Sequence, residues 1–82
     1  MSRQDYENGV RKANKAISNL SRLMGTKLSV KISKEKIGKY FSKMLQARDL
    51  DKPVRADFAK GMWLAYSYYV STGRRLDERL DL

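Results

Sequence analysis

Residues 53–73, PVRADFAKGMWLAYSYYVSTG, form the stretch that decides the fold. One helical face of this stretch carries five apolar side chains, Val54, Phe58, Met62, Ala65 and Tyr69. A second apolar face lies beside it and carries Ala59, Trp63, Tyr66 and Val70. A helix that is apolar around most of its circumference is normally buried around most of it. We therefore expect an all-α domain with a helix over residues 52–72, which lies either at the centre of the domain or half in the domain and half in an interface.

Three residues mark the ends of this central helix. Pro53 is tolerated in a first helical turn because the N–H that it lacks would have no partner there. Asp51 is the expected side-chain cap of that turn. Gly73 can adopt the left-handed conformation that ends many helices.

An earlier stretch, residues 3–24, predicts the first helix of the chain. Its apolar residues recur every three or four positions, at Tyr6, Val10, Ala13, Ile17, Leu20 and Met24. This spacing places them on one side of a helix. We expect Ser2 to cap the N-terminus and Gly25 to end the helix.

The segment between these two helices has a different spacing of apolar residues. Across residues 27–32 apolar and polar side chains alternate, which is typical of extended backbone. Helical spacing resumes afterwards at Ile37, Tyr40, Phe41, Met44 and Leu45. We therefore expect a short extended connector and then a second helix over residues 34–47, capped by Ser33.

The chain ends in GRRLDERLDL, residues 73–82, in which Leu76 and Leu80 are four apart. We expect a C-terminal tail or short helix there. No repeat, low-complexity segment or linker interrupts the 82 residues, so the sequence predicts one small three-helix domain.

The composition argues against several function classes. The chain has no Cys and no His, which removes the usual thiolate and imidazole ligands, nucleophiles and bases. Neighbouring acids such as Asp49 and Asp51 are typical of helix caps rather than of a metal site. No segment has the length or apolarity of a signal peptide or a membrane span. We expect a non-enzymatic cytoplasmic protein with no cofactor, no metal and no membrane partner.

The charge is unevenly distributed along the chain. Residues 1–48 contain 12 Lys or Arg against 3 acids, whereas residues 49–82 contain 6 of each sign, so the first part carries the whole net charge of +9. Cations at helical intervals can neutralise successive phosphates. We therefore expect a DNA- or RNA-binding accessory protein that contacts backbone phosphates. The candidate residues are Arg11, Lys15, Arg22, Lys27, Lys31, Lys36, Lys39, Lys43, Arg74 and Arg75.

The alternative is a protein-binding inhibitor or adaptor that docks on a larger nucleic-acid-handling complex. Its possible interface residues are Trp63, Tyr66, Val70, Leu76 and Leu80, although for Trp63 and Tyr66 burial in the core is the favoured interpretation. The same surplus apolar face could instead close a homodimer. A standard helix-turn-helix is disfavoured, because the third helix is nearly neutral and apolar whereas a helix that reads a DNA groove presents polar and basic side chains.

Overall fold

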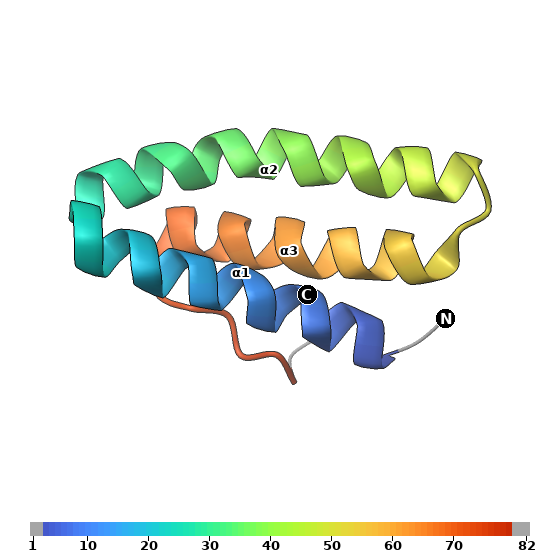
Figure 1. Cartoon of the computed structure of the whole chain (residues 1–82), viewed down its shortest axis with the longest axis horizontal. Coiled ribbons are helices and arrows are strands. Elements are labelled where there is room, and N and C mark those ends of the chain that lie inside the picture. Colours follow the sequence, from blue (N-terminus) through green and yellow to red (C-terminus); the bar gives the residue numbers. More distant parts are fainter. Residues whose placement is uncertain (1–2, 80–82) are drawn as a thin grey trace.

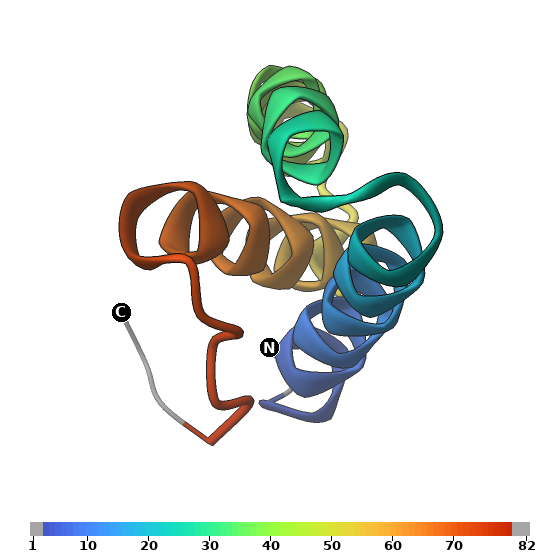
Figure 2. The ribbon, with the colours of Figure 1, turned by 90° about the vertical axis from the view of Figure 1, so that its left-hand side faces the viewer.

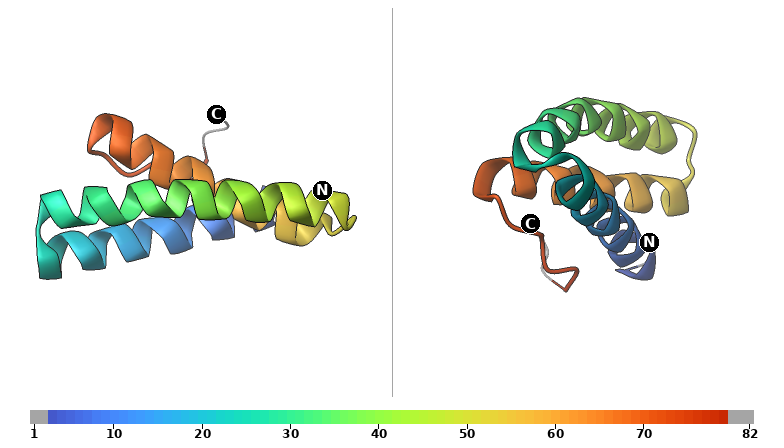
Figure 3. Two further views of the ribbon diagram at one scale, coloured as in Figure 1. Left: turned by 90° about the horizontal axis from the view of Figure 1, so that it is seen from above. Right: turned by 60° about the vertical axis from the view of Figure 1, so that its left-hand side comes forward.

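The computed structural model describes residues 3–79 and has an all-α fold. Three helices follow one another, α1 (Arg3–Met24), α2 (Thr26–Asp49) and α3 (Pro53–Thr72) (Figure 1). α1 and α2 run in opposite directions, and α3 runs back alongside α2. In the end-on view α3 lies below α2 and beside α1 (Figure 2), and it packs against both of these helices. Seen from above, it crosses behind α2 at an angle (Figure 3). The expected central position of the third helix is therefore confirmed.

The core forms where α3 packs against both other helices, and α1 and α2 contact each other far less. The face expected of the first helix is buried, with Val10 and Ala13 fully enclosed and Ile17 nearly so. Met24 departs from that expectation, because it lies beyond the packed part of α1 and is 55% exposed. The expected cap Ser2 lies outside the described residues.

Two glycines let α1 and α3 approach closely. A Cβ added at Gly9 would collide with the carbonyl oxygen of Phe58, and one added at Gly61 would collide with the carbonyl oxygen of Tyr6. The two backbones thus meet at positions where neither helix carries a side chain. Gly38 in α2 differs, because nothing lies within 4 Å of where its Cβ would be.

The expected extended connector is wrong, since residues 27–32 belong to α2. α2 begins directly after Gly25, which has a φ of 86° and a ψ of 167°. The physical reason lies in two serines, Ser29 and Ser33, which are four residues apart and fully buried. They are the fully buried positions of this part of α2, whereas Val30 is only partly buried against the core. The helical period is therefore not visible in the apolar residues alone. A helix also pairs its backbone groups internally, which an isolated extended segment cannot do.

The buried serines are hydrogen-bonded. The Ser33 hydroxyl donates to the Ser29 carbonyl oxygen at 2.7 Å, so Ser33 lies inside a helix and does not cap one. The Ser29 hydroxyl lies 2.8 Å from the Thr26 carbonyl oxygen and 2.9 Å from the Tyr69 hydroxyl. Burying these hydroxyls is tolerated because each has a partner.

The connection from α2 to α3 also corrects a prediction. Asp51 has a φ of 54° and does not cap α3; the N-cap is Lys52, which makes no side-chain cap hydrogen bond. Pro53 occupies the first turn as expected. Gly73 adopts the expected left-handed conformation and donates its N–H to the Tyr69 carbonyl oxygen at 2.8 Å.

After Gly73 the described part of the tail, residues 74–79, has no helix and lies along α1. Leu76 is 2% exposed and closes the core from this side. Its carbonyl oxygen accepts a hydrogen bond from the Asn14 side chain at 2.8 Å. Within residues 3–79, no helix has the length and apolarity needed to cross a membrane.

Candidate polyanion-binding groove

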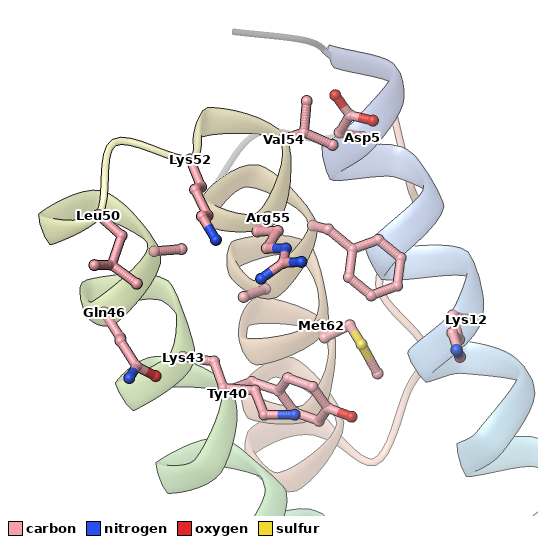
Figure 4. Close-up of a pocket in the computed structure, with 13 residues that line it drawn as sticks. Asp5, Lys12, Tyr40, Lys43, Gln46, Leu50, Lys52, Val54, Arg55 and Met62 are labelled. Atoms are coloured by element: carbon pink, nitrogen blue, oxygen red, sulfur yellow. The ribbon is translucent and has the colours of Figure 1, made fainter.

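A groove of about 510 Å³ lies between α1 and α2, with α3 behind it (Figure 4). We call it the basic groove. Its floor is apolar and comes mainly from α3, through Phe58, Ala59 and Met62, with Tyr40 and Ala47 contributed by α2. The groove exists because α1 and α2 pack on α3 and leave a gap between themselves.

The walls of the basic groove are cationic. Lys12 projects from α1, Lys43 from α2, and Lys52 and Arg55 from the start of α3. Asp5 is the one acidic residue in the lining. Four cations against one carboxylate give the groove a strong positive potential, which a concave, partly apolar surface concentrates.

Two of these lysines extend over aromatic rings. The Lys12 ammonium lies 5.8 Å from the Phe58 ring centroid, and the Lys43 ammonium lies 5.2 Å from that of Tyr40. The aliphatic stems can cover apolar surface while the charged ends stay at the solvent boundary. The floor thus positions ammonium groups at the mouth of the groove, where an anionic chain would meet them.

The predicted stripe on the second helix continues from the groove along α2. Lys36, Lys39 and Lys43 are spaced by three and four residues and therefore share one flank. The Lys39 ammonium lies 5.5 Å from the Tyr40 ring centroid, on the same ring as Lys43. The structure thus brings these three predicted residues onto the side of α2 that borders the groove.

Other predicted cations face elsewhere. Lys27 and Lys31 are exposed, and each lies two residues from the buried Ser29, which is about 200° around a helix. They therefore point away from α3, on the side opposite the core. Lys15 is exposed on α1 but does not line the groove.

Arg11 is committed to the tail instead. Its Nε donates to Glu78 Oε2 at 3.1 Å and its Nη2 to Oε1 at 2.9 Å. This two-point pair lowers the pKa of the Glu78 carboxyl, chiefly through the hydrogen bond from Arg11. The same hydrogen bond raises the pKa of the Arg11 guanidinium. Its guanidinium fork is therefore already occupied by a carboxylate.

Arg22, Arg74 and Arg75 lie together in a second pocket, where the end of α3 meets the turn between α1 and α2. This pocket lies at the opposite end of α3 from the basic groove. The ten predicted cations thus separate into a groove flank, a distant pocket, a tail contact and outward-facing charges.

Two of the residues predicted for a protein interface belong to the core. Tyr66 and Leu76 are each 2% exposed, so neither offers a surface to a partner. Tyr66 stacks on Tyr40 with ring centroids 5.9 Å apart, and burial raises its pKa to about 12. Trp63 and Val70 are half-buried, and Trp63 meets Phe41 edge to face at 4.9 Å. Leu80 lies outside the described residues.

Three groove cations were missing from the sequence prediction, Lys12, Lys52 and Arg55. Lys52 and Arg55 belong to the part of the chain whose charges cancel, so the charge distribution does not single them out. Lys52 and Arg55 lie at the start of the central helix, directly after the end of the basic second helix. This proximity in the sequence is the feature that could have identified them.

Comparison with protein-family models, curated protein sequences and solved structures finds no match to the chain. Among residues 3–79, no group of three or more acidic, His or Cys side chains is placed to hold a metal ion.

Proposed function

We propose that the chain binds nucleic acid, DNA or RNA, by contacting backbone phosphates through the basic groove and the adjoining flank of α2. The observation that carries the proposal is the convergence of Lys12, Lys43, Lys52 and Arg55 on one groove from three helices. Such an array neutralises several phosphates at once and releases their counterions. Lysines on flexible stems suit a repeating backbone better than they suit one fixed base edge, so binding is expected without marked sequence preference.

The experiment compares two charge-matched double variants in binding to fluorescent DNA and RNA oligonucleotides near physiological salt. Lys12→Glu with Lys43→Glu removes two groove cations. Lys34→Glu with Lys60→Glu makes the same change in net charge at residues that line neither pocket. Circular dichroism checks that both variants fold.

The groove variant is expected to lose affinity by about tenfold or more for each removed contact. The control variant should stay within about threefold, because charges outside the groove are screened by salt. Equal losses in the two variants would mean that nucleic acid binds to a diffuse positive surface of which the groove is only a part. No binding by the native chain would reject the proposal.

A second candidate function, a protein-binding adaptor, is favoured by one observation. Leu23, Met24 and Leu28 surround the α1–α2 turn, and Leu23 is 74% exposed. Adjacent exposed apolar side chains are typical of surfaces that another protein covers. Sedimentation of the purified chain tests its simplest form, a homodimer. A concentration-dependent dimer lost in Leu23→Ser would support it, whereas a monomer at high concentration would oppose it.

A further inference from the structure

The second pocket has a volume of about 590 Å³ and a composition unlike that of the basic groove. We call it the arginine pocket. Its polar lining consists of Arg22, Arg74, Arg75, Ser18, Ser21 and Thr26. No acidic residue is among the described residues that line it.

The chain holds the two tail arginines of this pocket in place. The Arg74 N–H donates to the Thr72 hydroxyl at 3.1 Å, directly after the left-handed Gly73. Arg75 Nη1 donates to the Ser18 hydroxyl at 2.8 Å. The next residue, Leu76, is buried, and so the backbone that carries both arginines is anchored on each side. The backbone of both arginines is therefore held in place, and the Arg75 side chain is held on Ser18 as well.

The electrostatics of the arginine pocket favour an anionic occupant. Three arginines line one concave site with no carboxylate in its described lining. Such a grouping is unfavourable by itself, and an anion at its centre relieves the repulsion. The groove differs in this respect, because Asp5 already stands among its cations.

The donors of the pocket indicate the kind of anion. Arginine forks match phosphate oxygens in pairs, and the Ser21 and Thr26 hydroxyls add further polar contacts. Ser18 accepts a hydrogen bond from Arg75, which leaves its hydroxyl hydrogen able to donate toward the pocket. A phosphate monoester offers three terminal oxygens and about two negative charges, whereas a backbone diester has two such oxygens and one charge. Three arginines suit the former.

We propose that the arginine pocket is a binding site for a phosphate monoester. The site is separate from the basic groove and stands whether or not the groove binds nucleic acid. The monoester could come from the 5′ end of a nucleic acid strand or from a small phosphorylated molecule. Both share the same dianionic head.

The first experiment titrates the native chain with inorganic phosphate at constant ionic strength near pH 7.5, with chloride as the reference. Arginine Nε–Hε and backbone amide signals are followed by NMR. Saturable shifts are expected at Arg22, Arg74 and Arg75, and not at Arg48, which lines neither pocket. Weak, non-saturating shifts of similar size at all arginines would mean ionic screening only and would overturn the proposal.

A pair of variants tests the residues. Arg22→Gln with Arg74→Gln should weaken phosphate binding about tenfold for each arginine lost. Arg48→Gln, a single-charge control outside both pockets, should leave it unchanged. All of these side chains are exposed, so thermal unfolding should be nearly the same in every variant. Equal phosphate affinity in the native chain and the double variant would show that the arginine pocket is not the phosphate site.

A last arm separates the two sources of the phosphate. Identical oligonucleotides with a 5′-phosphate or a 5′-hydroxyl are compared in the Lys12→Glu, Lys43→Glu chain, where groove binding is suppressed. A 5′-phosphate preference that Arg22→Gln and Arg74→Gln abolish would assign the pocket to nucleic acid ends. Saturable binding of inorganic phosphate without that preference would assign it to small phosphorylated molecules.

Discussion

The two candidate sites lie at opposite ends of α3 and differ in both floor and cation. The basic groove places three lysines and one arginine around apolar side chains, and the arginine pocket places three arginines beside hydroxyls. Flexible ammonium groups at the mouth of an apolar groove can adjust to a polymer, whereas planar guanidinium forks on a polar surface fit one compact group. We propose that one small domain thus offers two distinct kinds of anion recognition.

Each of the two sites has its own buried tyrosine from α3. Tyr66 stacks on Tyr40, whose ring forms part of the groove. Tyr69 lines the arginine pocket and shares a buried hydrogen bond with Ser29. The shape of both sites therefore depends on how tightly α1 and α2 are held against α3. A substitution that loosens the packing at one end should alter the site at that end.

The largest effect is expected where α1 meets α3. Gly9→Ala inserts a methyl group against the Phe58 backbone and should destabilise the fold by about 3 kcal/mol. Gly38→Ala makes the same change where nothing is in contact and should stabilise it by up to about 1 kcal/mol. Urea unfolding measures both. Equal effects would contradict the close α1–α3 contact that sets the width of the groove.

The next effect concerns the groove end at alkaline pH. Tyr66 has a folded-state pKa of about 12, above the usual value of 10, so the folded chain holds this proton more tightly than the unfolded chain. The resulting stability is complete below pH 10 and is lost as pH rises toward 12, by about 2 kcal/mol. Unfolding measured across this range should show a steeper fall for native protein than for Tyr66→Phe. Parallel curves would mean that the hydroxyl is not buried.

A smaller effect is expected at the arginine end. Removing either partner of the Ser29–Tyr69 hydrogen bond, by Ser29→Ala or Tyr69→Phe, should cost about 1 to 2 kcal/mol. Because the two hydroxyls share one bond, the double variant should cost less than the sum of the single variants. Strict additivity would show that the two hydroxyls do not interact.

The smallest effect concerns the exposed pair between the tail and α1. Arg11 lowers the pKa of Glu78, so the pair contributes above the ordinary carboxyl pKa and is lost as pH falls. Carboxyl NMR titration of Arg11→Gln should show the Glu78 pKa moving back toward its usual value. Oligonucleotide affinity should hardly change in Glu78→Gln, because the freed Arg11 lies outside the groove. A strong gain in oligonucleotide affinity would contradict this expectation and would show that Arg11 takes part in binding.

Local signals sufficed for much of the fold. α1 has a single apolar stripe and α3 has Pro53 and Gly73 at its ends, so their bounds and their packing follow from spacing and backbone preference. The start of α2 could not be found this way. Its fully buried residues are Ser29 and Ser33, and the partner that makes the burial of Ser29 acceptable, Tyr69, is 40 residues away.

The candidate site was only partly predictable for the same reason. The lysine stripe of α2 lies on one helix and was visible as spacing. The groove needs Lys12, Lys52 and Arg55 from two other helices, and their convergence depends on how the helices pack. Arg11 looked equivalent to its neighbours until the fold brought Glu78, 67 residues away, into contact with it.

The salt dependence of oligonucleotide binding tests the central claim most directly. The groove cations are Lys12, Lys43, Lys52 and Arg55, and the adjoining flank of α2 adds Lys36 and Lys39. If each of these six neutralises one phosphate, the logarithm of affinity should fall with the logarithm of salt concentration with a slope of about −4 to −5. Lys12→Glu with Lys43→Glu should reduce the steepness by about 2, whereas Lys34→Glu with Lys60→Glu should leave it nearly unchanged. A slope near zero, or one that the groove variant does not alter, would contradict the account.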